Sequence, residues 1–594
     1  MKDPRSSVPS EVESGWVFSW FLRLGVVYLV VALLAGAFDV SYILRHHVRY
    51  PFGDQWIWLA RLYERGFWCG FTSQYNEHRL IVPGVFYYAD YRYFGSRNTL
   101  LAIVSLLFQL GCGALLIVPL WRSTEVWKPL RCFFAGFVAM TVLWFIQAED
   151  LFYPYQLQIS CANFGILAAM HLFARLASRR KERVGRLAGL WVAVFACAFW
   201  ATFSFGHGIL IWPVLLALGM AARFSKRELL MIAAVFACAA SLYFIQYQKP
   251  AGSASPLESL RQPSRVVQYA VLLIGLPLFG AGAPDVSVMS HAGLYATAAT
   301  GVVLALLMLA RFALAKPGER QAFEYIYCAM LATNLGAAVL AALSRGNFPL
   351  EQALSGRYAP MPLIFWISLI ALTTIHLCRA EARGGVGRVM WCGLLAAASA
   401  VMLPAQFTMG HYMAYRARNQ AAAALSMAVG TPDAPRIREE MAPPALVAFV
   451  DRNGVRLLGH SLFADAGLQW LGSRVTDHFQ PAGGGACLGA VDSLNPVAGS
   501  TTPGVRLAGW AWDVRGHRAA RRVWVTDAEG MIRGLGQTGE ERPDVAGAYK
   551  DKAMAESGWV AYSRTPVPGT PFTVLAEVGD GRSVCPIGQR AAGN

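Results

Sequence analysis

Long apolar segments separated by short polar loops fill the first two-thirds of the chain. Each segment is roughly 18–25 residues long, which is the length that an α-helix needs to cross about 30 Å of hydrocarbon. We expect about eleven membrane-spanning helices, over residues 16–44, 99–120, 132–148, 159–178, 187–204, 208–223, 229–246, 292–312, 323–343, 359–378 and 389–408. A further run, 265–283, is interpreted as a re-entrant or interfacial helix inside a long outer loop, 247–291, with an ordinary span as the alternative.

The pattern changes after about residue 410. Residues 411–428 carry apolar positions at helical spacing and 434–475 has a mixed helical pattern, so we expect a helical connector over 410–484. From 485 to 594, short stretches alternate apolar and polar positions between glycine-rich turns, which is typical of a β-sandwich. We therefore expect a transmembrane domain over 1–409, the connector, and a β-sandwich domain resembling carbohydrate-binding modules.

Composition and charge support a multi-pass membrane protein. Only 15% of the residues are charged and the mean hydropathy is +0.40. The formal net charge is +16, but the basic residues cluster in alternate loops, around 122–131, 175–186, 223–227, 311–320 and 379–388. The positive-inside rule assigns these loops to the cytoplasm, together with the N-terminus. The charge is therefore explained by membrane topology, and nucleic-acid binding is not expected.

The first apolar segment and the cysteines refine this topology. Ala35-Gly36-Ala37 resembles a signal-peptide cleavage site, but the apolar run is too long for a signal core, so a retained helix is expected. Most cysteines lie in apolar segments as small hydrophobes, and no C-x-x-C pair indicates a metal site. Cys487 and Cys585 bracket the β domain and are expected to form a disulfide if that domain is extracytoplasmic.

Ionisable residues gather in the loops assigned to the outer face. An ionisable group near membrane depth is costly and indicates function. The candidates are Asp54, Glu77, His78 and Arg79 in the first loop, Glu149 and Asp150 in the second, His207 in the third, and Arg345, Arg357 and Tyr358 in the fourth.

Carboxylates, guanidinium groups and an apolar lining at an outer membrane surface suit the transfer of a sugar from a polyprenyl phosphate. A carboxylate takes the proton of the acceptor hydroxyl as it attacks the anomeric carbon. Guanidinium, imidazole or a divalent ion stabilises the charge that grows on the leaving phosphate. An apolar groove between helices accommodates the isoprenoid tail.

The loop F-G-D-Q-W, the stretch Y-N-E-H-R with Pro83, and S-G-R-Y resemble patterns in bacterial members of the GT-C superfamily of integral-membrane glycosyltransferases. The resemblance implies a plasma-membrane enzyme with a periplasmic C-terminal domain, a polyprenyl-phosphate-linked sugar donor, an inverting mechanism and Asp54 as the base. The acceptor would be a glycan, a lipid or a surface protein. Many members carry two adjacent acids where this chain has Asp54-Gln55, so a Mg²⁺ or Mn²⁺ ion held by such a pair is in doubt.

For the donor phosphate, the candidates are Arg79, His78, Arg345, Arg357 and Tyr358. Glu77, Glu149, Asp150 and His207 are candidates to support the acceptor or a metal, and Trp510 and Trp512 to stack on a glycan. Each has a structural alternative: a loop ion pair for Asp54, helix capping for the acids, anchoring at helix ends for the arginines, and a core position for the tryptophans.

Two other functions compete with this one. An O-antigen ligase or polymerase would use a lipid pyrophosphate donor and would not depend on Asp54. A transporter of lipid-linked glycans would carry charged residues inside several spans, whereas here they cluster at the outer ends.

Overall fold

The computed structural model describes residues 16–179, 184–250, 254–279, 291–316, 320–380, 386–441, 468–497, 503–564 and 571–591. The chain divides into two compact units, which we describe separately. Unit 1 comprises Met1–His47, Phe71–Tyr87 and Leu101–Met413. Unit 2 comprises Val48–Gly70, Tyr88–Leu100 and Ala414–Asn594. The boundary after Met413 lies close to the expected one after residue 409, but two pieces of the first outer loop belong to unit 2.

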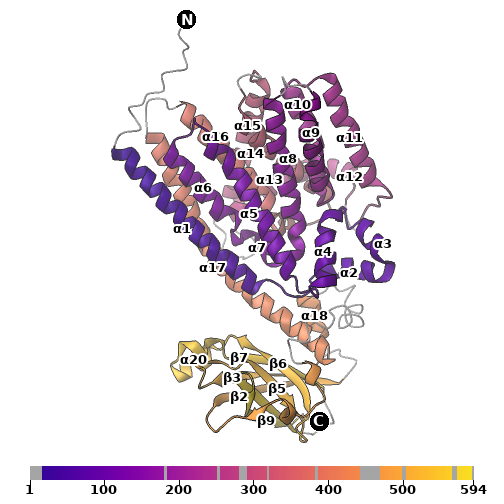
Figure 1. The fold of residues 1–594 in the computed structure, drawn as a ribbon, viewed down its shortest axis with the longest axis vertical. Helices are drawn as coiled ribbons and strands as arrows, with labels where there is room; N and C mark the ends of the chain where they lie inside the picture. Colours follow the sequence, from indigo (N-terminus) through magenta and orange to yellow (C-terminus); the bar gives the residue numbers. More distant parts are fainter. Residues whose placement is uncertain are drawn as a thin grey trace. The chain divides into compact units, whose positions relative to one another are not determined.

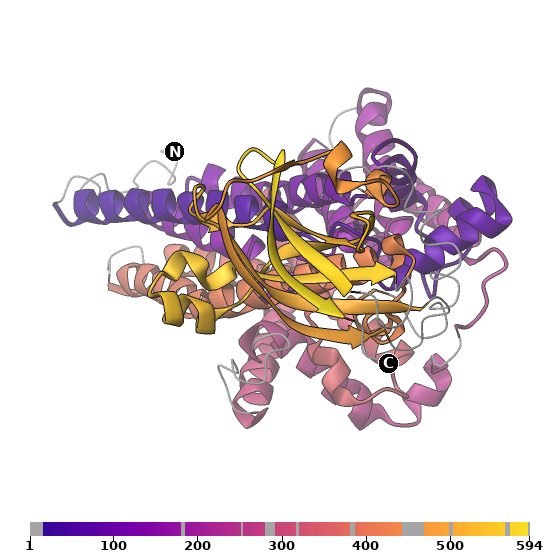
Figure 2. The ribbon, with the colours of Figure 1, turned by 90° about the horizontal axis from the view of Figure 1, so that it is seen from below.

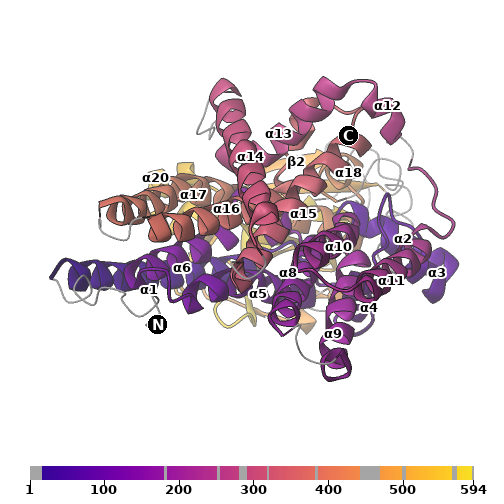
Figure 3. The same ribbon diagram turned by 90° about the horizontal axis from the view of Figure 1, so that it is seen from above.

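Unit 1 is a bundle of helices (Figures 1 and 3). Its longer helices are α1 (Trp16–His46), α5 (Thr99–Arg122), α6 (Lys128–Val142), α8 (Leu157–Ser178), α9 (Val184–Thr202), α10 (Ile211–Ala221), α11 (Lys226–Phe244), α13 (Pro263–Phe279), α14 (His291–Leu314), α15 (Ala322–Ser344), α16 (Pro360–Ala380) and the first part of α17 (Val386–Val429). Short helical pieces connect them: α7 (Ala148–Phe152), α12 (Pro256–Leu260), η1 (Phe145–Gln147), η2 (Pro154–Gln156), η3 (Gly206–Leu210), η5 (Leu350–Leu354) and η6 (Gly356–Tyr358).

Among the described residues, nine helices are long and apolar enough to cross a membrane. Each of the eleven expected spans falls on a helix, but α9 and α10 provide only shorter apolar stretches, Leu187–Thr202 and Gly206–Ala221. The run at 265–283 is helical as far as Phe279, and this helix, α13, packs against α14, α15 and α16. Its last residues, from 280, lie outside the described part of the chain.

The expected span 132–148 is interrupted in the structure. Helix α6 ends at Val142, and the chain then turns through η1 into α7. Side-chain amides replace the helical hydrogen bonds that are missing at this helix end. Nε2 of Gln109 and Nε2 of Gln147 both donate to the Val142 carbonyl, at 2.9 and 2.8 Å. A buried carbonyl needs a hydrogen-bond partner in an apolar bundle, so these glutamines allow the helix to end at Val142. The apolar pattern of 132–148 does not predict this helix end.

Unit 2 contains α2 (Asp54–Arg65), α3 (Phe67–Thr72, whose last residues fall in unit 1), the end of α4 (Ile81–Tyr93) and the second part of α17. It continues with α18 (Ala434–Glu440), η8 (Leu468–Trp470) and η9 (Val475–Asp477). Residues 442–467 of the expected connector lie outside the described residues. The expected separate helices at 389–408 and 411–428 form one continuous helix, α17.

The described strands of unit 2 form one nine-stranded hydrogen-bonded sheet in the order β1-β9-β8-β5-β6-β7-β3-β2, with β4 paired to β3. The sheet is drawn in orange and yellow in Figure 2. The strands are β1 (Gln480–Pro481), β2 (Cys487–Pro496), β3 (Gly504–Asp513), β4 (Arg518–Ala519), β5 (Arg522–Thr526), β6 (Ile532–Glu540), β7 (Gly558–Arg564), β8 (Pro571–Val578) and β9 (Ser583–Ala591). Except for the β1–β9 pair, neighbours are antiparallel.

The sheet curls, so that β2 and β9 pack together although they lie near opposite ends of the strand order. A disulfide joins Cys487 on β2 to Cys585 on β9, as the cysteine pattern predicts. The side chains on one face of the sheet form an apolar core inside the curl, which includes Leu507, Val523 and Phe572. The opposite face packs against the end of α17. The expected β-sandwich region is thus a β domain, built from one hydrogen-bonded sheet that curls and has an apolar layer on each face.

Trp510 and Trp512 do not form an open stacking platform. Trp512 is 5% exposed and belongs to a small core with Val545 of α20 (Pro543–Tyr549) and Met554 of η10 (Lys552–Glu556). Trp510 packs against this core and meets the Tyr549 ring at 5.3 Å between centroids. The two tryptophans share one face of β3 because side chains alternate along a strand. Their role here is to hold α20 on the sheet.

Candidate functional site

A cavity of about 420 Å³ in unit 1 has a mostly apolar wall and one polar end. We call it the Glu77 pocket. Its apolar wall comes from η3, α11, α15 and α16. Its ionisable lining residues include Glu77, Arg345, Lys249, His78 and His207. The remaining lining includes Phe205, Gly206, Ile209, Tyr243, Phe244, Tyr247, Pro250, Ala254, Ser255, Pro256, Ala337, Leu340, Ala341, Leu343, Ser344, Tyr358 and Met361.

A tight turn carries Glu77 and His78 into this pocket. The backbone N–H groups of Tyr75 and His78 each donate to the other residue's carbonyl, at 2.7 and 2.8 Å. Asn76 occupies the first central position with φ of 48°, a left-handed conformation that asparagine tolerates better than most residues. The Y-N-E-H sequence therefore encodes a two-residue hairpin turn with the glutamate near its tip.

Arg79 holds this turn against α11 and is not a free phosphate ligand. Its Nε donates to the Tyr243 carbonyl at 2.7 Å, its Nη1 to the Thr72 carbonyl at 2.5 Å, and its Nη2 to the Ile245 carbonyl. The side chain is buried at 8% exposure. The last carbonyls of a helix lack intrahelical donors, so the guanidinium caps the end of α11. The structure thus favours the structural alternative over the expected donor-phosphate role.

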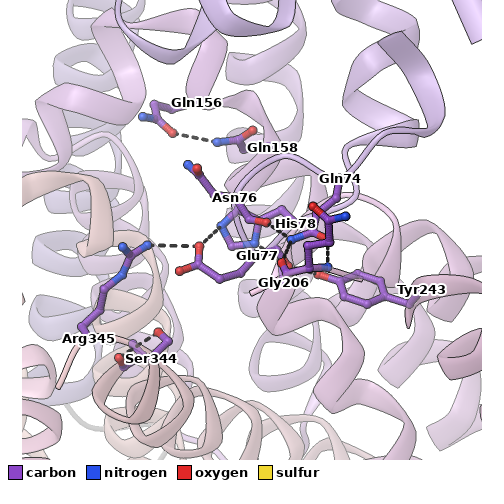
Figure 4. Close-up of polar contacts among 12 residues, drawn as sticks. Gln74, Asn76, Glu77, His78, Gln156, Gln158, Gly206, Tyr243, Ser344 and Arg345 are labelled. Atoms are coloured by element: carbon purple, nitrogen blue, oxygen red, sulfur yellow. Dashed lines mark hydrogen bonds and ion pairs between the residues drawn. The ribbon is translucent and has the colours of Figure 1, made fainter. Parts of the chain in front are cut away.

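Glu77, Arg345 and His78 meet at the polar end of the pocket (Figure 4). Nη2 of Arg345 lies 3.3 Å from Oε2 of Glu77, and Nε2 of His78 lies 4.0 Å from the same oxygen. The three side chains are between 16% and 20% exposed. Arg345 directly follows α15 and also lies over the Phe348 ring, at 5.4 Å from its centroid. The cluster therefore combines a carboxylate with two potential cations while remaining open to the pocket.

His78 is neutral at physiological pH. Burial lowers its pKa from 6.5 to about 4, Glu77 opposes this shift, and the charges of Arg345 and Arg357 add to it. The Nδ1 atom accepts the Gly206 N–H at 3.2 Å, so the proton of the neutral ring resides on Nε2, the atom nearest Glu77. The imidazole can therefore donate to Glu77 or to a bound anion without carrying charge.

The η3 segment and Phe205, which precedes it, line the pocket and contact His78. The Phe205 ring packs on the imidazole at 4.0 Å between centroids. A Cβ on Gly206 would lie 2.6 Å from Nδ1 of His78, so glycine is required for this close approach. Nε2 of His207 lies 3.0 Å from Oδ1 of Asn163 in α8. His207 thus lines the pocket and is anchored to the bundle.

Arg357 and Asp150 lie near the same cluster. The Arg357 charge acts on His78, and its guanidinium stacks on the Tyr358 ring at 5.3 Å from the centroid. The segments that carry these residues, η6 and α7, are in contact. Asp150 is 7% exposed, and neither carboxylate oxygen has a hydrogen-bond partner among the described residues. Glu149 beside it is half-buried. Buried carboxylates without a donor are rare in proteins, so Asp150 stays a candidate site residue.

Asp54 lies in unit 2, whereas the Glu77 pocket is built from unit 1. It is the first residue of α2, after Gly53 with φ of 53°. A buried network shapes this loop: Nε2 of Gln55 donates to Oδ1 of Asn98 at 2.7 Å, and Nδ2 of Asn98 donates to the Val48 and Tyr50 carbonyls at 3.1 and 3.0 Å. Gln55, the residue that differs from the paired-acid pattern, therefore has a structural function.

The described residues around the Glu77 pocket do not form a protein cage for a divalent cation. No group of three or more His, Cys, Asp or Glu side chains suited to a metal occurs within the described ranges. Beside Glu77, the positive charge comes from Arg345. A Mg²⁺ ion ordinarily needs several oxygen ligands at about 2.0–2.1 Å, which this cluster does not provide by itself.

Several lining residues were not expected from the sequence. Phe205, Tyr243, Tyr247 and Met361 occur in or beside apolar segments, where an aromatic or methionine side chain normally indicates lipid or core contact. Lys249 follows α11 in an exposed loop and pairs with Glu258 at 3.4 Å. Only the bundle geometry brings these segments to one cavity, so no local signal identifies them.

Comparison with known proteins yields no relative. No protein-family model, no curated protein and no solved structure matches this chain. The class that the described residues define is therefore the coarse one: a helical membrane-embedded protein with a C-terminal curled β-sheet.

Proposed function

We propose that this protein is a membrane glycosyltransferase that moves a sugar from a polyprenyl-phosphate donor to an extracytoplasmic acceptor hydroxyl, with inversion. The observation that carries the proposal is the Glu77 pocket, whose long apolar wall ends at a carboxylate, a guanidinium and a neutral imidazole. Such a cavity suits an amphiphile with an apolar tail and an anionic head. A soluble metabolite would gain little from that wall.

Arg345 is the group proposed to bind the donor phosphate. Guanidinium groups form strong, charge-assisted bonds with phosphate oxygens. In the structure Arg345 contacts Glu77 through one nitrogen at 3.3 Å. A dianionic or monoanionic phosphate at the polar end would compete with Glu77 for this guanidinium. Donor binding would then release the Glu77 carboxylate at the place where the sugar is attached.

The released Glu77 carboxylate is proposed as the base. It would take the proton of the acceptor hydroxyl while oxygen forms its bond to the anomeric carbon and the bond to the phosphate oxygen breaks. Arg345, and Nε2–H of His78, would stabilise the negative charge on the leaving phosphate. Asp54 is the base that the family resemblance implies, and it belongs to the other unit. The two carboxylates therefore make different experimental predictions.

The test is transfer of a labelled sugar by purified protein in proteoliposomes, with several polyprenyl-phosphate donors and a membrane extract as acceptor pool. We expect Glu77→Gln to lower transfer at least 100-fold, because the base and the partner of Arg345 are both lost. Glu351→Gln is the matched control, since Glu351 is an exposed acid of η5. It should retain parental activity.

The same assay with Asp54→Asn separates the two bases. Loss of transfer in this variant alone would assign the base to Asp54 and leave Glu77 a binding role. Loss in Glu77→Gln alone supports the assignment made here. If the parent transfers no sugar from any lipid-phosphate donor, the proposed reaction class is wrong.

A further inference from the structure

A second cavity lies at the C-terminal ends of α5 and α8, next to a proline inside α5. Pro119 has no N–H, so the Leu115 carbonyl cannot receive its usual helical bond. Nε2 of His171 in α8 lies 2.8 Å from that carbonyl and must donate to it, because a carbonyl only accepts. The hydroxyl of Tyr327 in α15 likewise donates to the Leu116 carbonyl at 2.7 Å. Three helices are thus joined next to this proline.

The cavity below these bonds has a volume of about 330 Å³, and we call it the Arg122 cavity. Its walls come from the ends of α5 and α8, the loop after α5 and the start of α15. The lining residues are Val118, Pro119, Arg122, Ser123, Thr124, Glu125, His171, Ala174, Arg175, Ser178, Gln321, Ala322, Phe323 and Ile326. The positive-inside rule assigns this end of the bundle to the cytoplasm.

The cavity has an excess of positive charge. Arg122 and Arg175 are exposed, and their charges both act on His171. Within the part of the chain that the structure describes, neither guanidinium has a hydrogen-bond or ion-pair partner. The lining carboxylate, Glu125, already pairs with Nε of Arg379 at 2.8 Å.

Arg379 is fully engaged in turn. Its Nη1 lies 2.8 Å from Oε1 of Glu324 in α15. Glu125, the carboxylate among the lining residues, is thus held in an ion pair with Arg379, which is itself paired with Glu324. Two guanidinium groups without hydrogen-bond or ion-pair partners among the described residues therefore line a cavity of ligand size.

We propose that the Arg122 cavity binds a phosphate ester. Paired guanidinium groups recognise phosphate oxygens, and Val118, Ala174 and Phe323 provide an apolar floor for the carbon part of the ester. The ester can belong to an anionic phospholipid headgroup or to a soluble metabolite. This site is separate from the Glu77 pocket and does not depend on the proposed transferase activity.

The experiment compares ligand binding to full-length parent protein and charge-matched variants. Arg122→Gln/Arg175→Gln removes both guanidinium groups from the cavity. Arg227→Gln/Arg311→Gln removes two exposed arginines from helix ends outside it and serves as the control. Ser178→Phe retains both arginines but fills the mouth of the cavity. Monodispersity and thermal midpoint confirm that each variant is folded.

Two arms identify the source of the ester. Native mass spectrometry of protein released from nanodiscs of phosphatidylglycerol and phosphatidylcholine measures retained lipid. Thermal shift with glycerol 3-phosphate, against glycerol, measures a soluble ester. We expect the parent and the control double variant to bind at least tenfold better than Arg122→Gln/Arg175→Gln and Ser178→Phe, in one arm or both.

Retention of phosphatidylglycerol alone would assign the site to a lipid headgroup, and a shift with glycerol 3-phosphate alone would assign it to a soluble ester. Equal binding by the cavity variants and the control variant in both arms would overturn the proposal. Equal retention of phosphatidylcholine by all proteins would show apolar association only, and would also count against it.

Discussion

Arg79 and Arg345 carry the same side chain but have different surroundings, and these decide what each can do. Arg79 donates to two carbonyls at the end of α11 and to the last carbonyl of α3, which use its donors. Arg345 contacts one carboxylate and remains partly exposed at the pocket. A buried arginine that bonds backbone carbonyls contributes stability, whereas one with an exchangeable anionic partner is suited to ligand binding.

We predict that Arg79→Lys lowers the free energy of unfolding by about 2–4 kcal/mol, because a lysine cannot reach all three carbonyls and leaves buried acceptors without donors. The dependence of transfer on donor concentration should remain parental in the folded fraction. Thermal unfolding and donor titration measure the two effects. Arg261→Lys, an exposed exchange, is the control. A raised donor KM without loss of stability would instead support a role of Arg79 in binding the donor phosphate.

Asp90 is a buried acid whose titration should be visible in stability. It is 1% exposed, and burial raises its pKa from 3.8 to about 6, although Oδ2 accepts the Asn98 N–H at 3.1 Å. Between these two values the folded state holds a proton that the unfolded state has lost. Stability from this group is therefore full at acid pH and falls as the pH rises through about 4 to 6, by up to about 3 kcal/mol.

We predict that Asp90→Asn removes this pH dependence. The amide retains an acceptor oxygen for Asn98 but carries no charge. The variant should therefore gain stability relative to the parent at pH 7.5 and lose most of this advantage by pH 4.5. Differential scanning fluorimetry across this range measures the difference. Asp477→Asn, an exposed exchange in the same unit, should follow the parent. An unchanged parental slope in Asp90→Asn would contradict the assignment.

At the scale of elements, η3 is the short segment on which the Glu77 pocket depends. Its Gly206 both donates to His78 and leaves room for the imidazole. A methyl group at this position would come within 2.6 Å of Nδ1 of His78. The ring must then move, and its Nε2 would no longer face Glu77.

We therefore predict that Gly206→Ala lowers sugar transfer at least tenfold while the protein remains folded, because only the imidazole needs to shift. Gly189→Ala in α9 is the matched control, since nothing lies within 4 Å of its added Cβ. Transfer rate and thermal midpoint are measured together. Parental transfer by Gly206→Ala would show that the position of His78 does not matter for the reaction.

The helices were largely predictable because apolar length is a local property. The expected spans 323–343 and 359–378 correspond closely to α15 and α16. The merging of 389–408 and 411–428 into α17 was not predictable from polarity, because the change from apolar to polar residues near Gly410 does not end the helix. A Cβ on Gly410 would lie 3.3 Å from the rings of Phe145 and Tyr42, so glycine gives the helix room beside them. The sequence identified Glu77, His78 and Arg345, but their convergence depends on contacts between segments up to 268 residues apart.

At the scale of the whole molecule, the structure divides the predicted chemistry between two units. Glu77, His78, His207, Arg345 and Tyr358 line one pocket of unit 1, whereas Asp54 and the tryptophans of β3 belong to unit 2. Asp54 was expected to act with the outer-face arginines because they share a predicted face of the membrane. A prediction that residues lie at the same face of the membrane restricts their depth but not their lateral position. It therefore cannot decide which of several acids lines the same cavity as the arginines.

The disulfide is the feature of unit 2 with the clearest measurable effect. It joins strands near opposite ends of the sheet order, 98 residues apart in sequence. A loop of this length contributes about 4–5 kcal/mol in the chain-entropy description. We predict that Cys487→Ala/Cys585→Ala lowers the unfolding temperature of unit 2, measured by proteolysis on heating. Cys238→Ala, an exposed free thiol, should have no effect, and neither should a reductant on the double variant.

The same bond sets an order of events during synthesis. Cys487 emerges with β2, but its partner arrives only with β9, after every other strand of the sheet has been made. Until then Cys487 remains a reactive thiol in whichever compartment receives it. A maleimide reagent added to growing cells would therefore label unfinished or misassembled chains and leave mature ones unlabelled at this position. The cystine thus provides a chemical record that the whole sheet has been made and has folded.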